Sequence, residues 1–399
     1  MENKNCCDNS TSDKKVKVLK IKPRSINYSK TGLLASTNQS SCRCSGEVCS
    51  SQIITEYTNN DYWITDEIKT DAGIVPQVST KLVLHDTLGT LKVRWGINRM
   101  NYKINPGIYA VGTPDKESHV LVTANYKLTF DALRKELTGL NVWILVLDTK
   151  GINVWCAAGK GTFGTKELIN RINKTKLSTI VLHRTLILPQ LGAPGVSAHE
   201  VTKNTDFKIK YGPVRAKDVK EFINSGMKAT DEMRRIKFNL MDRLILTPME
   251  LVGTFKTSLM ILGILFLLNL LTVNPFGIID FYAYTGALIA GCVITPVLLP
   301  WIPGRAFSWK GWLMGFLWTL VVISLNGGII SPSFGVLKEL GYLLVLPSIS
   351  AFYAMNFTGS STYTSFSGVL KEMRKAIPPT IVTIGIGAVL LLVSSFIKL

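Results

Sequence analysis

The apolar residues of the chain follow two different patterns, which divide it near residue 240. From residue 61 to about 240, short apolar runs alternate with amphipathic stretches, whereas long uncharged runs dominate the rest. Five runs contain no Asp, Glu, Lys or Arg: 257–279, 281–304, 311–337, 340–370 and 376–397. Each can supply the roughly 20 apolar residues that an α-helix needs to cross a bilayer. We therefore predict an all-α transmembrane domain over 241–399, with five spans near 256–275, 279–300, 310–328, 337–356 and 378–397.

The first pattern, over residues 61–240, predicts alternating strands and helices. The expected strands are KLVLHD (81–86), LKVRWG (91–96), VLVTANY (120–126), VWILVLD (142–148) and STIVLHR (178–184). Amphipathic segments between or after them predict helices at FDALRKELTGL, KELINRINK and AKDVKEFINSG. Strand–helix–strand repetition indicates a mostly parallel sheet, so we expect a Rossmann-like α/β domain. Ligands of such domains bind beyond the carboxyl ends of the strands.

Charge sets the expected orientation. The net charge is +18, and Lys and Arg cluster before the first span, between the second and third, and between the fourth and fifth. By the positive-inside rule, the N-terminus lies inside and the C-terminus outside, in a multi-pass protein of the cell (inner) membrane. The first residues lack the apolar core of a signal peptide, so the α/β domain is expected in the cytoplasm. The basic charge suits a membrane surface rather than nucleic acid, because no basic stripe interleaved with aromatic residues occurs.

The seven cysteines fall into a tail set and two single residues. The polar and Ser-rich residues 1–60 are predicted to be a disordered tail. A cytoplasmic location argues against structural disulfides there. The tail cysteines are compatible with a flexible, thiol-bearing segment or with metal binding. They are Cys6, Cys7, Cys42, Cys44 and Cys49.

One of the single cysteines, Cys156, lies in GINVWCAAGKGTFGT, directly after the apolar run 142–148. A phosphate-binding loop is excluded, because that motif needs glycine at 154 and Ser or Thr at 161. Cys156 could be a small buried apolar residue. Alternatively, Asn153 caps a short helix in which Cys156 occupies the first turn, where the helix dipole favours a thiolate. The surrounding glycines and alanines would then let a large flat ligand approach the backbone closely.

Four segments carry a resemblance to a known family: NVWCAAGK (153–160), VTANYKLTFD (122–131), LPQLGAPGVSAHE (188–200) and YGPVRAKD (211–218). They resemble the HgcA family of mercury-methylating corrinoid proteins, over roughly residues 60–399. That family shares its corrinoid-binding domain with the large subunit of the corrinoid iron–sulfur protein. The resemblance implies a cobalamin-type corrinoid, base-off, with Cys156 as catalytic residue and lower axial ligand of cobalt. It implies ring contacts from Asn153, Val154, Trp155, Ala157, Ala158, Gly159, Lys160 and Gly161. Further candidates for cofactor binding, at strand ends and in turns, are Thr123, Thr129, Gln190, Gly192 and Ala193.

The implied activity is that of a corrinoid-dependent methyltransferase of an anaerobe. It would transfer a methyl group from cobalt to Hg(II), forming methylmercury. Axial-ligand identity tunes cofactor chemistry, and a donating thiolate favours delivery of the methyl group to an electrophile. The implied partners are the ferredoxin-like protein HgcB, with two 4Fe–4S clusters, and a methyltetrahydrofolate-linked methyl donor protein. Two alternatives stay open: a membrane-anchored corrinoid methyl carrier of one-carbon metabolism, and a non-enzymatic membrane transporter or sensor.

Overall fold

The computed structural model of the 399-residue chain describes residues 54–58, 61–271, 276–327, 335–361, 363 and 366–397. The expected disordered tail, residues 1–60, lies outside the described residues except for 54–58. The same holds for its five cysteines, so both predictions about the tail stay predictions.

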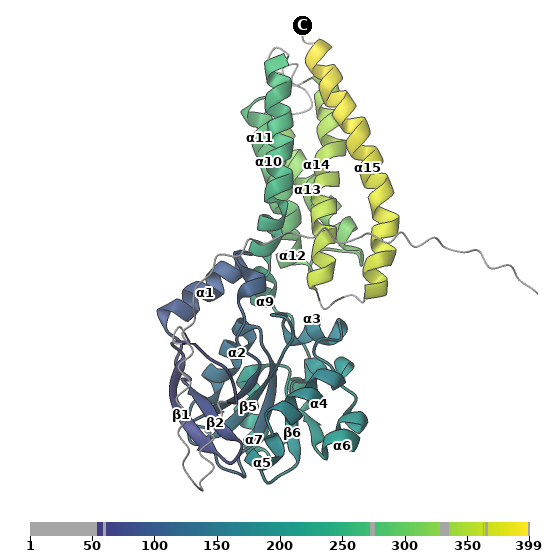
Figure 1. The fold of residues 1–399 in the computed structure, drawn as a ribbon. Coiled ribbons are helices and arrows are strands. Elements are labelled where there is room, and N and C mark those ends of the chain that lie inside the picture. Colours follow the sequence, from purple (N-terminus) through teal and green to yellow (C-terminus); the bar gives the residue numbers. More distant parts are fainter. Residues whose placement is uncertain are drawn as a thin grey trace, which may run out of the picture. The chain divides into compact units, whose positions relative to one another are not determined.

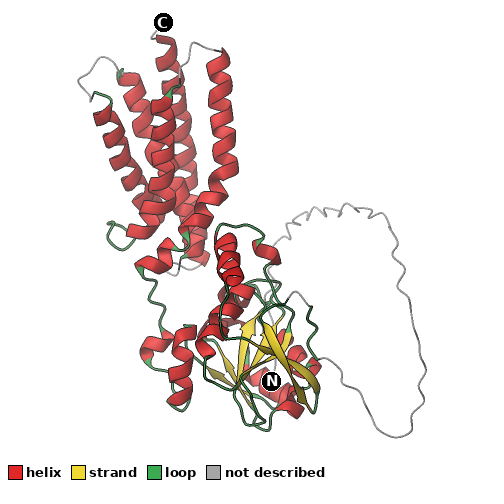
Figure 2. Cartoon of the chain, turned by 90° about the vertical axis from the view of Figure 1, so that its left-hand side faces the viewer, coloured by secondary structure: helices red, strands yellow, loops and turns green. Residues whose placement is uncertain are grey.

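The first part of the described chain is built on a seven-stranded mixed sheet (Figures 1 and 2). Its order is β1–β2–β3–β5–β4–β6–β7. Neighbours β5, β4, β6 and β7 run parallel, whereas β1 pairs antiparallel with β2, and β3 antiparallel with β5. The strands are β1 (Ile64–Thr70), β2 (Gly73–Val78), β3 (Gly107–Val111), β4 (Val120–Ala124), β5 (Val142–Leu147), β6 (Thr185–Leu188) and β7 (Lys208–Tyr211). The predicted Rossmann-like α/β class is confirmed.

Helices cover both faces of this sheet. Successive residues of β5 alternate between two buried clusters: Trp143, Leu145 and Leu147 face one, and Val142, Ile144 and Val146 face the other. The first cluster includes residues of α3 (Val154–Gly159), α4 (Thr165–Lys174), α5 (Leu177–Ile180) and α6 (Ala198–Thr205). The second includes residues of α2 (Lys127–Arg134) and α7 (Val219–Asn224). Because both faces are covered, β4 and β5 are buried throughout, and all their residues except Thr123 are apolar.

Three of the predicted strands are wrong. KLVLHD and LKVRWG contribute to one helix, α1 (Leu84–Arg94), and its apolar residues recur at helical rather than strand spacing. The Asp86 carboxylate accepts a hydrogen bond from the Val83 backbone N–H at 3.0 Å and so closes the first turn. STIVLHR also forms no strand: its first residues complete α5, and β6 begins only at Thr185, where Leu186 pairs with Val120.

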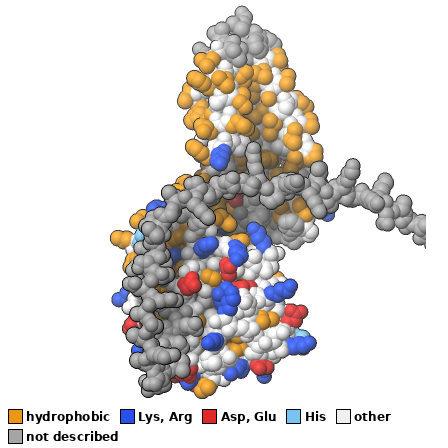
Figure 3. All heavy atoms as spheres, viewed as in Figure 1, with side chains coloured by type: hydrophobic (Ala, Val, Ile, Leu, Met, Phe, Trp, Pro, Cys, Tyr) orange, Lys and Arg blue, Asp and Glu red, His pale blue; other side chains and the backbone are white. Residues whose placement is uncertain are grey.

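The remainder of the described chain is helical. Five helical segments are long and apolar enough to cross a membrane: Leu240–Leu270, Ile278–Leu298, Phe307–Leu325, Val336–Gly359 and Ser367–Ser394. The elements are α8 (Asp231–Arg234), α9 (Leu240–Leu244), α10 (Thr247–Leu271), α11 (Ile278–Ile289), the π-helical turn η5 (Ala290–Ile294), α12 (Thr295–Leu298), α13 (Phe307–Leu325), α14 (Val336–Asn356) and α15 (Phe366–Ile397). Figure 3 shows orange apolar side chains over these helices, whereas blue and red charged side chains are concentrated on the α/β domain. The prediction of an all-α region with five membrane-spanning candidates is confirmed.

Candidate functional site

The candidate site begins where β4 and β5 end. Asn125 follows β4 and is almost completely buried. Its side-chain oxygen accepts hydrogen bonds from the backbone N–H groups of Thr149 and Gly151, both at 3.0 Å, and from the Thr149 hydroxyl at 2.9 Å. Gly151 itself has a φ of 74°, so the chain turns sharply there. Asn125 therefore fixes the loop that leads from β5 into α3.

Helix α3 begins as the sequence predicts. The Asn153 side chain accepts a hydrogen bond from the Cys156 backbone N–H at 2.9 Å and caps the helix. The Cys156 side chain is half-buried, so it is neither sealed in the core nor fully in solvent. Trp155 is 38% exposed, and Gly159, Lys160 and Gly161 are exposed. Together these residues form an accessible face of α3, here called the α3 face.

Two predicted ring contacts, Ala157 and Ala158, are covered by protein. They are 0% and 6% exposed and belong to the core on the α4 side of the sheet. Behind them lies the 3₁₀ segment η3 (Gln190–Gly195), which follows β6. A Cβ on Gly195 would lie 3.0 Å from the Ala158 Cα and 2.2 Å from the Phe163 carbonyl oxygen. The small residues Ala158 and Gly195 therefore allow α3 to pack closely on η3.

Gly159 and Gly161 have a different environment. A Cβ at either position would meet no atom within 4 Å. Gly161 has a φ of 77°, which by itself favours glycine, but Gly159 lies in ordinary helical backbone. Glycine at 159 costs helix stability, and no neighbouring atom of the described residues requires it. The bare backbone at Gly159 thus leaves space that none of the described residues fills.

Beside α3 lies an apolar pocket of about 300 Å³. None of its described lining residues is charged. It opens among the ends of β4 and β6, helix α2 and the start of α3, and its lining includes Thr123, Thr129, Asn153, Val154 and Trp155. The structure therefore brings these five predicted residues together around one cavity.

Other predicted residues lie away from this pocket. Cys156 lies on the α3 face and does not line the pocket. Gln190, Gly192 and Ala193 belong to η3, which reaches the pocket only through Leu191. Gly192 is buried, and a Cβ there would lie 2.5 Å from Phe163 Cε1, so packing accounts for this glycine.

Sequence reasoning missed Asn125 as the residue that organises the loop before α3. The signal was present, because a polar amide directly follows an apolar strand that ends at the ligand-binding edge of a parallel sheet. Gly195 was also missed, since its role depends on the close approach of two segments far apart in the sequence.

Comparison with known proteins adds a relationship to this geometry. Residues 63–223 match the family model "CO dehydrogenase/acetyl-CoA synthase delta subunit". These residues are related to the large subunit of the corrinoid iron–sulfur protein. The related region contains the complete sheet from β1 to β7, and it includes α3 and the pocket.

Three relatives are gamma subunits of the acetyl-CoA decarbonylase/synthase complex. That of Archaeoglobus fulgidus is 30% identical over 144 residues, which are 35% of this chain and 30% of the relative. That of Methanocaldococcus jannaschii is 36% identical over 92 residues, 23% of this chain and 19% of the relative. The gamma 1 subunit of Methanosarcina thermophila is 32% identical over 120 residues, 29% and 25%. The chain thus covers less than a third of the length of these relatives, and the five candidate spans lie outside the family match.

Proposed function

We propose that the chain is a membrane-anchored corrinoid protein that transfers a methyl group from cobalt to Hg(II). The single observation that carries the proposal is the α3 face, where a half-buried thiol stands beside exposed glycine backbone on a capped helix. A bound corrinoid would supply the cobalt that carries the methyl group. The residues of the chain would bind this group, orient it and set the donor strength of the ligand below the metal.

Cys156 fits the role of a single protein ligand. Among the described residues, no three His, Cys, Asp or Glu side chains come together in a group that could hold a metal ion. A metal ion at Cys156 would therefore need most of its ligands from outside the described part of the chain, which a macrocycle provides. Thiolate is a strong donor, and we propose that it favours release of the methyl group to an electrophile such as Hg(II).

The residues around Cys156 would position the ring. The exposed backbone at Gly159 and Gly161 leaves room for a flat group to lie against α3. Lys160 is exposed next to it and can pair with acidic substituents of a ligand. Asn125 and Asn153 would act as positioning residues, because they fix the loop and the first turn that hold Cys156.

The apolar pocket next to α3 would hold the displaced base of the corrinoid. Its lining contains no charged residue among those described, and its volume of about 300 Å³ is large enough for a flat aromatic base. Thr123 and Thr129 could offer hydroxyl groups to the linking chain of that base. With the base held in this pocket, Cys156 would be the side chain of this domain that holds the metal.

The proposed partners follow from the reaction. A thiolate ligand makes the metal harder to reduce, so turnover would need a low-potential electron donor, proposed to be the ferredoxin-like HgcB. A methyltetrahydrofolate-linked protein would supply the methyl group. We propose that the five spans anchor the chain in the inner membrane with the α/β domain in the cytoplasm, as Lys and Arg placement favours.

The second candidate is a membrane-anchored methyl carrier of one-carbon metabolism. It is favoured by the relatives, which are subunits of the acetyl-CoA decarbonylase/synthase complex. A single-turnover assay separates the two. Purified full-length protein in lipid nanodiscs, loaded with methylated corrinoid, is offered thiol-bound Hg(II) or homocysteine, and methyl transfer to each is measured.

We expect faster transfer to Hg(II), and Cys156→His should reduce that preference because imidazole is a weaker donor than thiolate. Cys292→Ala is the matched control, since the Cys292 thiol is buried in the second candidate span, far from the α3 face in sequence. Preference of the unaltered protein for homocysteine would support the methyl-carrier function. Absence of corrinoid absorbance after reconstitution would favour the transporter or sensor.

A further inference from the structure

Helix α1 (Leu84–Arg94) has an inverted distribution of polarity. Its leucines face outward: Leu84 is 82% exposed, Leu88 54% and Leu91 53%. The residues that it buries are Asp86, which is 1% exposed, and Val93. A helix at the surface of a soluble domain normally does the opposite, with leucine inside and carboxylates in water.

The exposed leucines of α1 form one strip along the helix, which together with the exposed Trp95, Ile97 and Met100 that follow is here called the α1 apolar face. With 3.6 residues per turn, positions 84, 88, 91 and 95 fall on the same side of a helix. Trp95, directly after α1, is 43% exposed and continues this side. The chain then adds Ile97 and Met100, which are 59% and 62% exposed. A contiguous exposed surface of this kind indicates a binding site rather than scattered surface leucines.

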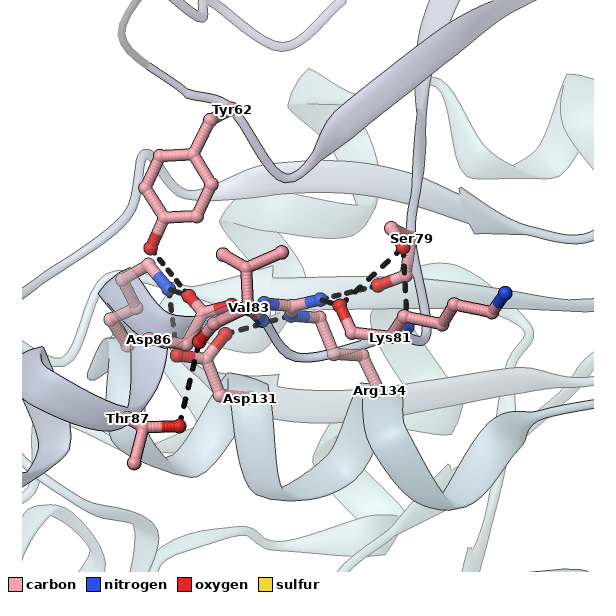
Figure 4. A network of polar contacts seen from close by, with 9 residues as sticks. Tyr62, Ser79, Lys81, Val83, Asp86, Thr87, Asp131 and Arg134 are labelled. Atoms are coloured by element: carbon pink, nitrogen blue, oxygen red, sulfur yellow. Dashed lines mark hydrogen bonds and ion pairs between the residues drawn. The ribbon is translucent and has the colours of Figure 1, made fainter.

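A buried ionic network fixes the rotation of α1 (Figure 4). The Asp86 carboxylate accepts hydrogen bonds from Lys127 Nζ at 2.6 Å and from Arg134 Nη2 at 2.8 Å. Asp131 accepts from the same two cations, both at 2.7 Å. Turning α1 to bury its leucines would pull Asp86 out and leave Lys127 and Arg134 without one carboxylate in a buried site, which is strongly unfavourable. The outward orientation of the apolar face is therefore built into the domain.

Basic residues border the α1 apolar face. At about 100° per residue, Lys92 and Arg94 project on opposite sides of it, and Lys81 and Lys103 lie exposed just before and after the segment. An apolar strip bordered by Lys and Arg matches anionic lipid, because the leucines enter the headgroup–acyl boundary while the cations contact phosphate groups. The same chain carries five candidate membrane spans, the first of which contains α10, so a lipid surface is available to this domain.

We propose that α1 is an interfacial helix that lies in the surface of the membrane, with the leucines, Trp95, Ile97 and Met100 inserted among the lipids. This attachment would give the α/β domain a second, non-covalent link to the bilayer besides the chain connection into α10. It would hold one side of the domain against the lipid and limit how the domain rotates. The inference is independent of the corrinoid, because it concerns α1 and not the α3 face.

The test uses photo-cross-linking in the full-length protein. Leu88 and Leu91 are replaced, one at a time, by p-benzoylphenylalanine, and the protein is reconstituted in nanodiscs of equal parts phosphatidylcholine and phosphatidylglycerol. After illumination, mass spectrometry identifies what is attached to each position. Leu182→p-benzoylphenylalanine is the matched control, since Leu182 is a leucine of the same domain that is 65% exposed and lies outside α1.

We expect lipid adducts at positions 88 and 91, with a yield at least about tenfold above the yield at position 182. Moving one leucine-sized side chain from water into lipid changes its partition between the two by about that factor. Adding Leu88→Glu to the position-91 probe should lower the lipid adduct by a similar factor, and both sites are exposed, so the fold should persist. Equal lipid labelling at 91 and 182 would overturn the proposal. Adducts at 88 and 91 to another protein, to a second copy or to another segment of this chain, without lipid, would also overturn it.

Discussion

Replacing Gly159 offers the sharpest test of the α3 face, because the substitution should raise the stability of the fold and lower the affinity for corrinoid. In Gly159→Ala, the new methyl group would meet no protein atom within 4 Å, and the backbone is helical. Alanine in a helix is more stable than glycine by about 0.5–1 kcal/mol. In a domain of this size, that gain corresponds to a rise of roughly 1–4 °C in the melting temperature.

Binding should change in the other direction. If a corrin ring lies against the backbone at 159, the methyl group occupies its place and costs about 1–3 kcal/mol, as overpacking does elsewhere. The affinity for corrinoid should then fall by about tenfold or more. The full-length protein in nanodiscs is titrated with cobinamide and with hydroxocobalamin, binding is followed by absorbance, and melting of the apo-protein is followed by circular dichroism.

Gly253→Ala is the matched control. Gly253 is an exposed helical glycine in α10, where an added Cβ also meets no atom within 4 Å. It should leave corrinoid affinity unchanged. Unaltered affinity in Gly159→Ala, together with the expected stabilisation, would refute a ring on this side of α3. Destabilisation of Gly159→Ala would instead show that the space around residue 159 is filled by protein.

Other predictions concern the ligand, the buried network and the topology. Cys156→Ala should preserve the circular dichroism spectrum but alter the absorbance of bound corrinoid and abolish methyl transfer; an unchanged absorbance spectrum would make Cys156 a structural residue. Burial alone would raise the pKa of Asp86, but hydrogen bonds from Lys127 and Tyr62 lower it to about 2, below the ordinary value of 3.8. A lowered carboxylate pKa stabilises the fold above about pH 4. Melting curves should therefore show that the free energy of unfolding falls by about 2 kcal/mol as the pH falls toward 2, and this decrease should be absent in Asp86→Asn. Asp86→Asn should itself destabilise the domain by about 3 kcal/mol at neutral pH, because the buried cations Lys127 and Arg134 lose one of their two carboxylates. A reporter fused after Leu399 should be active only outside the cytoplasm, and cytoplasmic activity would indicate an even number of spans.

The sequence predicted those parts of the fold whose signals are local and strong. Continuous apolar runs such as 142–147 become strands buried on both faces, and uncharged runs of about 20 residues become the candidate spans. Asn153 could be predicted as a cap because its signal lies within three residues of its partner. The first turn of α3 could therefore be predicted from the sequence.

Other features depend on contacts that no local pattern records. The short apolar runs around α1 predict two strands, whereas the segment forms a helix that buries Asp86 against Lys127 and Arg134 of α2. Small residues suit both a ring and a tight helix contact, so the sequence does not separate the two roles for Ala158. The buried packing of Ala158 near Gly195 depends on segments far apart in the sequence.

The packing of α3 on η3 has a consequence for how the domain responds when a ligand displaces α3. A Cβ added to Gly195 would lie 3.0 Å from the Ala158 Cα, so the two segments pack closely there and a movement of one would displace the other. η3 follows β6, and it begins 36 residues after the start of α3. If a ligand bound to Cys156 displaced α3, the neighbouring β6–α6 connection would be displaced with it. Ligand exchange at the thiol would therefore change the rate of amide hydrogen exchange in residues 190–196 before it changed that rate in the sheet.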